Sequence, residues 1–385
     1  MADKAVENIC EKEAKLISSL LLLALNIDEK EKKKRLAQFY TTKYHYIFQG
    51  LKIPKAVSVV EPFVGTGLLK DWAIENGASL VETYDVDPKI QCTEIRNTLC
   101  NPPDYKGKYI VTNPPFLARN KTKDKTLFDL YETNDLYKCF IKTVVDGNAM
   151  GGVVITPLNF FCDERVTEAR DLFLTNYSVE KLNIFEETVF DDTTYTVCSF
   201  QFKRSSQSLS NQKIQTTIFP HQNEIVLDVC KEHDWKVAGH LFEKVKSDYK
   251  VGRLAWRETK NDRGSKFHSV TKDEWDRASK IYLYGIDGGT EANRIRLSLR
   301  EKPFCGIPTD RVFATLTITP SISEDKQSKI VSTFNKELEE LRTKYNSLFL
   351  TNFRNSTKAY ARKRIGFDMV YNMVKKIIND IDKSA

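Results

Sequence analysis

Short apolar runs alternate with longer polar or amphipathic stretches along the first half of the chain. The runs that indicate strands are AVSVVEPF (56–63), LVETYDVD (80–87), YIVTNP (109–114), GGVVITPL (151–158), VEKLNIFEE (179–187) and YTVCSFQFKR (195–204). Most of them are separated by 15–35 residues, enough for a helix. This alternation is typical of a parallel sheet covered by helices on both faces. Only TVFDDTT separates the last two runs, which is too short for a parallel crossover, so we expect an antiparallel pair at one edge of the sheet.

The remaining segments predict helices near both ends of the chain and a linker between two domains. Apolar residues near helical spacing indicate a helical segment within residues 1–50. The serine-rich stretch RSSQSLSNQK (204–213) predicts a linker, which would separate an α/β domain over residues 1–204 from an α+β domain over residues 205–385. Residues 323–347 predict a charged amphipathic helix, and residues 355–382 predict one or two more.

Charge is unevenly distributed between these two domains. Residues 205–385 contain 32 Lys and Arg against 23 Asp and Glu, a net charge of +9, which leaves −2 for residues 1–204. A basic second half favours a catalytic part joined to an anion-binding part. The longest apolar run, Leu20 to Leu25, is far shorter than the roughly 20 residues of a membrane span. The N-terminus also lacks a signal-peptide pattern, so we expect an intracellular, cytoplasmic protein.

Cysteine and histidine spacing does not predict a metal site. The chain has 8 cysteines, none in a CxxC pair, and 5 histidines. We therefore expect reduced, mostly buried thiols in a reducing compartment.

A glycine turn after the first strand gives the first chemical signal. In VSVVEPFVGTGLL (57–69), Gly65 and Gly67 stand where the strand turns into a predicted helix, and such glycines let the backbone approach a ligand closely. An ordinary tight turn would explain the glycines alone. However, Asp85 and Asp87 end the next strand, where a doubly wound sheet holds a ribose diol. The GxGxxG fingerprint is absent, so a nucleoside without pyrophosphate fits better than NAD.

The stretch YIVTNPPFLARN (109–120) predicts a site for a planar amine. Its strand delivers Asn113 to the sheet edge where ligands bind. Because two prolines fix the backbone, the Asn113 side-chain oxygen and the Pro114 carbonyl form two aimed acceptors for an NH2 group. Phe116 supplies a flat face for an aromatic ring. Acceptors outside the ring plane would localise the nitrogen lone pair and orient it for attack on an activated methyl group.

Taken together, EPFVGTG, YDVDP and TNPPF resemble the class I S-adenosylmethionine-dependent methyltransferases that act on planar nitrogen. The sequence is most similar to the γ-type DNA adenine-N6 methyltransferases of type II restriction–modification systems. RLAQFYTT (35–42) resembles the methyl-donor motif of that family, with Thr42 in place of the usual Pro, and FDDTTYTVCSF (190–200) resembles its aromatic target-base motif. The resemblance covers residues 35–204. Since the donor motif closely precedes NPPF, the recognition domain must follow Arg204.

This resemblance implies a fold, a cofactor and partners. The fold would be a doubly wound, mostly parallel seven-stranded sheet with an antiparallel edge hairpin, followed by a C-terminal α+β recognition domain. The methyl donor would be S-adenosyl-L-methionine, with S-adenosyl-L-homocysteine as product. The partner would be double-stranded DNA, bound by a monomer that protects its site from a cognate restriction endonuclease without a stable complex between them.

Roles for individual residues also come from the resemblance. Asn113, Pro114, Pro115 and Phe116 would act at the target amine, and the base would stack on Phe116 and Phe190, with Tyr195 as the alternative to Phe190. Asp85 would bind the ribose of the donor. Asn97, where the family usually has Asp, would lie near the adenine of the donor. Leu136 and Tyr137 would line the donor pocket. The full donor set is Gln38, Phe39, Tyr40, Thr41, Glu61, Pro62, Phe63, Gly65, Gly67, Asp85, Val86, Asn97, Asn113 and Leu136. The expected DNA-binding residues are Arg253, Arg257, Arg294, Arg296, Arg354, Lys358, Arg362, Lys363 and Arg364.

Other functions are compatible with the same motifs. The amine could be N4 of cytosine, an RNA base or a protein glutamine amide, since NPPF also occurs in methyltransferases acting on those groups. A catalytically silent DNA-binding paralogue is a second alternative. A fused restriction enzyme is disfavoured, because no convincing paired-carboxylate-plus-Lys nuclease motif follows residue 205.

Overall fold

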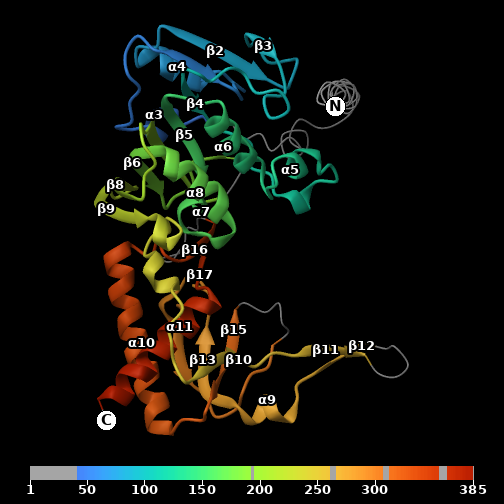
Figure 1. Cartoon of the computed structure of the whole chain (residues 1–385), viewed down its shortest axis with the longest axis vertical. Coiled ribbons are helices and arrows are strands. Elements are labelled where there is room, and N and C mark those ends of the chain that lie inside the picture. The colour runs from blue at the N-terminus through green and yellow to red at the C-terminus, as the bar shows by residue number, and fades with distance from the viewer. Residues whose placement is uncertain (1–40, 192–194, 261–265, 307–311, 355–361, 385) are drawn as a thin grey trace.

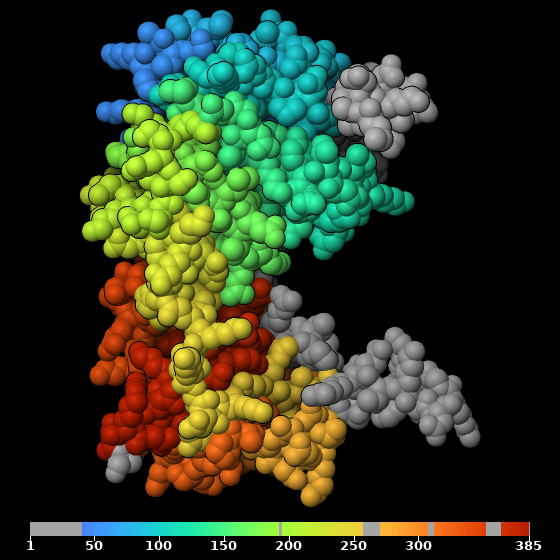
Figure 2. Space-filling view, in the orientation of Figure 1, coloured from blue at the N-terminus to red at the C-terminus, as the bar shows by residue number. Residues whose placement is uncertain are grey.

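A computed structural model describes residues 41–384 except 192–194, 261–265, 307–311 and 355–361 (Figure 1). The predicted N-terminal helical segment therefore lies mostly outside the described residues, which include only the short helix α3 (Tyr44–Ile47) from that region. Figure 2 shows two parts stacked along the long axis of the molecule, the first coloured blue to green and the second orange to red. Within the described ranges, no helix is both long enough and apolar enough to cross a membrane.

The first part is built on a large mixed sheet whose strand order is β3-β2-β1-β4-β5-β7-β6-β8-β9. The strands from β3 to β5 are parallel to one another, whereas β7 is antiparallel to both β5 and β6. The bounds are β1 (Ser58–Glu61), β2 (Leu80–Asp85), β3 (Glu94–Ile95), β4 (Tyr109–Thr112), β5 (Gly151–Pro157), β6 (Tyr177–Phe185), β7 (Val197–Arg204), β8 (Asn211–Phe219) and β9 (Asn223–Cys230). The predicted parallel sheet and its antiparallel β6–β7 pair are confirmed.

Three details of the prediction were wrong, all for one reason. The sheet has nine strands in the described part of the chain rather than seven, and β8 and β9 occupy the edge where we expected the antiparallel pair. Residues 204–213 are not a linker between domains, because β8 begins at Asn211 and pairs with β6. The first core extends to Trp235 and Val237, beyond the expected boundary at residue 204. A serine-rich sequence marks a surface turn, but it does not show whether the next strand joins the same sheet.

Helices pack against this sheet and against one another. Helix α4 contacts β1, β2 and β4, while α6 packs against α8. The helix bounds are α4 (Leu68–Glu75), α5 (Thr126–Leu130), α6 (Leu136–Asp146), α7 (Asn159–Cys162) and α8 (Thr167–Asn176). In α6, the buried residues Tyr137, Phe140, Ile141 and Val144 recur at helical spacing, so one stripe of the helix faces the core.

The second part has its own antiparallel sheet and its own core. Its strand order is β10-β15-β13-β14, and α10 and α11 contact this sheet. The bounds are β10 (Lys250–Arg253), β13 (Ala278–Tyr284), β14 (Arg296–Leu299), β15 (Phe313–Thr319), α9 (Lys272–Asp276), α10 (Glu324–Tyr345) and α11 (Phe367–Lys383). Two hairpins, β11 (Arg257–Lys260) with β12 (Lys266–Ser269) and β16 (Thr351–Arg354) with β17 (Arg362–Arg364), complete this part. The predicted amphipathic helix at 323–347 is confirmed as α10, whereas the region 355–382 holds β17 and α11.

The close approach of β4 and β5 generates a stability prediction. Gly152 pairs with Ile110, and a Cβ atom built on Gly152 would lie 2.0 Å from the carbonyl oxygen of Ile110. We expect Gly152→Ala to force these strands apart and to lower the free energy of unfolding by about 3 kcal/mol. Urea denaturation would measure this as a lower midpoint. The control is Gly366→Ala, where a Cβ atom would meet nothing within 4 Å; equal midpoints for the two variants would contradict the argument.

Candidate active site at the carboxyl ends of β1 and β4

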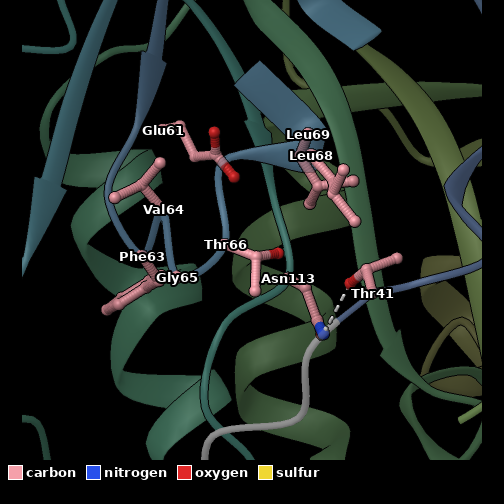
Figure 3. Close-up of a pocket in the computed structure, with 9 residues that line it drawn as sticks. All are labelled: Thr41, Glu61, Phe63, Val64, Gly65, Thr66, Leu68, Leu69 and Asn113. Atoms are coloured by element: carbon pink, nitrogen blue, oxygen red, sulfur yellow. Dashed lines mark hydrogen bonds between the residues drawn. The ribbon is translucent and has the colours of Figure 1, made fainter. Parts of the chain in front are cut away.

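A pocket lies where β1 and β4 end (Figure 3). Both strands end at the same edge because β4 pairs in parallel with β1, with Val60 opposite Ile110. Thr41, Glu61, Phe63, Gly65 and Asn113, all predicted site residues, line this pocket together. The lining is completed by Val64, Thr66, Leu68 and Leu69.

Asn113 is held by a residue from the predicted donor motif. Its Nδ2 donates a hydrogen bond to Oγ1 of Thr41 over 3.1 Å (Figure 3). Thr41 itself is buried. An amide held through its nitrogen presents its oxygen as the acceptor, which is the orientation that a target NH2 group requires. The other donor-motif residues, Gln38, Phe39 and Tyr40, lie outside the described residues.

Glu61 is a buried carboxyl group in the wall of the pocket. Its side chain is 1% exposed, and within the described residues neither carboxylate oxygen has a hydrogen-bond partner. Burial raises the pKa of Glu61 well above its ordinary value, the backbone N–H of Lys70 opposes this rise, and the nearby charge of Asp85 adds to it. Buried polar groups are nearly always satisfied, and leaving one unpaired costs free energy. Such a carboxyl group at the pocket wall fits a ligand that brings a hydrogen-bond donor or a cation.

Asp85 fixes the glycine turn rather than lining the pocket. Its Oδ2 accepts from the backbone N–H of Gly65 over 2.9 Å, and its Oδ1 accepts from the N–H of Asp87 over 2.8 Å. Asp85 is 5% exposed, and burial raises its pKa even though these hydrogen bonds oppose the rise. Gly67 has φ 82°, a left-handed conformation that favours glycine, and caps the N-terminus of α4. The contact of Asp85 with a ribose stays a prediction.

The remaining predicted donor residues of the described chain do not line the pocket. The Thr98 hydroxyl donates to the carbonyl of Pro62 over 3.0 Å. The Oδ1 of Asn97 accepts from the N–H of Leu99 over 3.2 Å. Leu136 begins α6 and is partly buried, and Val86 is also partly buried. Asn97 therefore caps its own turn, and its role toward a donor adenine stays a prediction.

The aromatic residues differ in how accessible they are. Phe116 is 6% exposed and meets the ring of Tyr137 edge-on, with centroids 6.1 Å apart. Phe190 is 2% exposed and lies in the main core, so its expected open face toward a flipped base is not present in this conformation. Tyr195, the alternative, is 44% exposed. A sequence motif cannot show which of two nearby aromatic residues the core absorbs.

Two of the predicted DNA-binding residues are held by internal ion pairs. Arg294 pairs with Glu291 at 3.3 Å and with Glu339 at 3.0 Å. Lys363 is buried and pairs with Glu186 at 3.4 Å. Glu339 and Glu186 are far along the chain from their partners, so the sequence alone does not reveal these two ion pairs. Both side chains therefore have carboxylates of the chain beside them, and their contact with DNA stays a prediction.

The other predicted DNA-binding residues fall into two groups. Arg253 lies over the ring of Phe367, and Arg296 lies over the ring of Tyr284; in each case the Cζ atom is 4.1 Å from the ring centroid. Arg364 is partly buried on β17. The side chains of Arg257, Arg354, Lys358 and Arg362 lie outside the described residues.

The sequence analysis missed Asp135, which stands beside the NPPF segment. Asp135 forms an antiparallel bridge with Ala118, and the N–H of Leu136 donates to the carbonyl of Leu117 over 3.1 Å. Its Oδ1 is buried without a hydrogen-bond partner in the described structure. Burial raises the pKa of Asp135 to about 6, although Lys138 opposes the rise. The only signal available was an acidic residue directly before the predicted Leu136–Tyr137 pair.

The raised pKa of Asp135 predicts a pH dependence of stability. Because the folded protein holds this proton more tightly than the unfolded chain, the free energy of unfolding should fall as pH rises from about 4 through about 6. Asp135→Asn should remove that decline and make the variant more stable above pH 6, by roughly 1–3 kcal/mol. Thermal unfolding between pH 4 and pH 8 would measure this. Parallel pH curves for parent and variant would contradict it.

Comparison with known proteins agrees with these motifs. Residues 12–190 match the Eco57I restriction-modification methylase family. The type II methyltransferase M.HincII of Haemophilus influenzae is 26% identical over 194 residues, which cover 45% of this chain and 38% of that protein. M.HindII from the same species is also 26% identical over 194 residues, covering 37% of its length. The matched stretch thus spans well under half of either relative.

Solved structures give weaker likenesses. The type IIG restriction endonuclease BpuSI has a TM-score of 0.40 and 10% identity, with coverage of 93% of this chain and 61% of that one. The M protein of the type I restriction enzyme EcoKI has a TM-score of 0.32 and 14% identity, with coverage of 43% and 45%. These likenesses are too weak to assign a function. The family match covers residues 12–190, a little under half of the chain, and shows that this stretch is similar to the Eco57I restriction-modification methylases.

Proposed function

We propose that this protein is a DNA methyltransferase that transfers a methyl group from S-adenosyl-L-methionine to N6 of adenine. The main support is the position of Asn113, at the end of β4 and within one pocket with Glu61 and the glycine turn. The family match supports a methyltransferase of a restriction-modification system. Because the matched stretch spans 38% of the relative M.HincII, the activity, the substrate and any cognate endonuclease are part of the proposal.

The residues at the pocket fit the methyl donor. The donor supplies an electrophilic methyl group on a sulfonium. Glu61 would accept from its ammonium group, since both carboxylate oxygens lack hydrogen-bond partners within the described chain. The donor would lie against the turn at Gly65 and Gly67. The space beside Gly67 is open, since a Cβ atom built there would meet nothing within 4 Å. Asp85 keeps lone pairs beyond its two backbone hydrogen bonds, so it would accept from the ribose.

The target amine would bind at the other side of the pocket. An adenine in a duplex must be flipped out before its N6 reaches Asn113. The Asn113 side-chain oxygen and the Pro114 carbonyl would accept its two hydrogens and orient the nitrogen lone pair toward the methyl group. Pro115 would keep this corner rigid, and Phe116 would stack on the base. The nitrogen loses a proton only after the methyl bond has formed, so no strong base is required.

DNA is the favoured polymer because residues 205–385 carry a net charge of +9. Cytosine N4, an RNA base and a glutamine amide offer the same planar NH2 group and remain alternatives. A silent DNA-binding paralogue is a further alternative. The burial of Glu61 without a hydrogen-bond partner among the described residues argues against it, because a protein that binds no donor gains nothing from that cost.

The first experiment is methyl transfer from labelled S-adenosyl-L-methionine to unmethylated genomic DNA, total RNA and a glutamine-containing peptide. We expect N6-methyladenine in DNA, and we expect Asn113→Ala to lower the rate by at least about 100-fold while donor binding persists. Mass analysis of the product nucleoside identifies the modified base. Label in RNA or in the peptide would refute DNA as the substrate, and donor binding without any transfer would support the silent paralogue.

The exposure of Tyr195 predicts a difference between two aromatic variants. We expect Tyr195→Ala to lower kcat/KM about tenfold with an unchanged melting temperature, because base stacking is worth about 1–3 kcal/mol. Phe190→Ala should instead destabilise the fold by about 3–5 kcal/mol, since Phe190 is a core residue. Val226→Ala is the control for loss of an exposed apolar side chain. Full activity of Tyr195→Ala, together with loss of activity in a stably folded Phe190→Leu, would assign stacking to Phe190.

A further inference from the structure

One face of the second sheet holds a cluster of tyrosine and arginine side chains. Alternate residues of its strands, such as Leu283 on β13 and Leu297 on β14, lie in the core with α10 and α11. Successive side chains of a strand point to opposite faces, so the intervening residues lie on the other side. We call this side the tyrosine–arginine face, and it comprises Tyr282, Tyr284, Arg296, Arg300 and Phe313. In the strand register, Tyr284 stands opposite both Arg296 and Phe313.

The two arginines rest on aromatic rings. The Cζ of Arg296 lies 4.1 Å from the ring centroid of Tyr284, and the Cζ of Arg300 lies 3.8 Å from that of Tyr282. The guanidinium of Arg300 also donates to the hydroxyl of Tyr284. Beneath them, Tyr282 stacks on Phe313, with centroids 5.9 Å apart and planes tilted by 23°. Cation–π contacts orient a guanidinium without neutralising it, so both arginines keep a full positive charge in a fixed position.

Among the described residues, these two arginines have no acidic partner, whereas others in the same domain do. Arg342 pairs with the buried carboxylate of Asp287 at 2.8 Å, and Arg294 pairs with two glutamates. Neither Arg296 nor Arg300 forms an ion pair with a carboxylate of the described residues. The Nη1 of Arg296 donates to the carbonyls of Ala292 and Arg294, which leaves its other N–H groups available. The face thus presents two pre-oriented, unneutralised guanidinium groups.

The same face begins close to the catalytic part of the molecule. Directly after β13, Ile286 forms a bridge with Arg364 of β17. The neighbouring residue Lys363 reaches Glu186, at the end of β6. Glu186 lies four residues before Phe190, at the start of the segment that resembles the target-base motif. A polymer bound along the tyrosine–arginine face would therefore lie near the segment that handles the target base.

We infer that the tyrosine–arginine face binds the DNA duplex beside the methylated base, through the guanidinium groups of Arg296 and Arg300. The inference rests on the proposed function and extends it to named residues of the recognition domain. Arginine bonds bidentately both to phosphate oxygens and to the O6 and N7 atoms of guanine. Held on tyrosine rings, these two side chains lose little conformational freedom on binding.

The test measures binding of a fluorescein-labelled, random-sequence duplex by anisotropy, alongside donor binding by calorimetry. We expect Arg296→Gln and Arg300→Gln each to weaken duplex binding about tenfold, and the double variant to weaken it further, with donor binding unchanged. Arg277→Gln is the matched control, because Arg277 lies in the same domain but pairs with Asp273 at 2.6 Å. Arg300→Lys keeps the charge without the planar fork and should show a smaller loss. Thermal unfolding of each variant excludes loss of the fold.

The salt dependence then identifies the kind of contact. If the arginine contacts a phosphate, its replacement should reduce the slope of log K against log salt by about 1. If the arginine contacts a base, its replacement should leave the slope unchanged and reduce the discrimination between duplex sequences. Either result supports the inference. Duplex affinity equal to that of the parent in both single variants and in the double variant would overturn it. If the parent protein binds the donor but no duplex, both DNA as the substrate and DNA binding by this face are refuted. If the variants lose duplex affinity but the parent does not methylate DNA, only the proposed reaction is refuted.

Discussion

The candidate site depends on the parallel pairing of β4 with its two neighbours. Val60 of β1 and Gly152 of β5 both stand opposite Ile110, and all three lie in a solvent-excluded layer. β5 approaches this closely because Gly152 has no side chain to meet the Ile110 backbone. Since parallel strands end at one edge, this register brings Glu61 and Asn113 to the same pocket. The composition of the candidate site is thus set by backbone hydrogen bonds in the centre of the sheet.

The pocket is incomplete electrostatically without a ligand. Two other buried carboxylates have partners: Asp85 accepts two backbone hydrogen bonds, and Asp287 accepts hydrogen bonds from Arg342. Glu61 has none within the described residues, and its burial favours the protonated form. A ligand that donates a hydrogen bond to Glu61 removes the free-energy cost of leaving this buried group unpaired. Binding at this pocket should therefore also stabilise the fold, because anything that binds only the folded state shifts the equilibrium toward it.

Local patterns were sufficient to predict which strand ends meet at the sheet edge, but not where the first core ends. The glycine turn, the acidic strand end and NPPF each lie within a few residues, so the sequence predicted which elements would meet at the edge. The place of β8 depended instead on its pairing with β6, more than 30 residues earlier in the chain, which a serine-rich turn does not reveal. The burial of Phe190 and the ion pair of Lys363 with Glu186 are likewise long-range contacts. Sequence reasoning failed where the outcome depended on tertiary neighbours.

The same distinction explains why the net charge of the second half can favour DNA as the partner without identifying the residues that bind it. The second domain carries many basic residues, but carboxylates from its own helices neutralise some of them, as Glu339 of α10 does for Arg294. What matters is a charge that the fold orients and leaves unpaired. Arg296 and Arg300 meet that condition because their neighbours are tyrosine rings rather than acids. An aromatic ring holds a cation and cannot accept its proton or neutralise its charge, so the full attraction for phosphate or guanine persists.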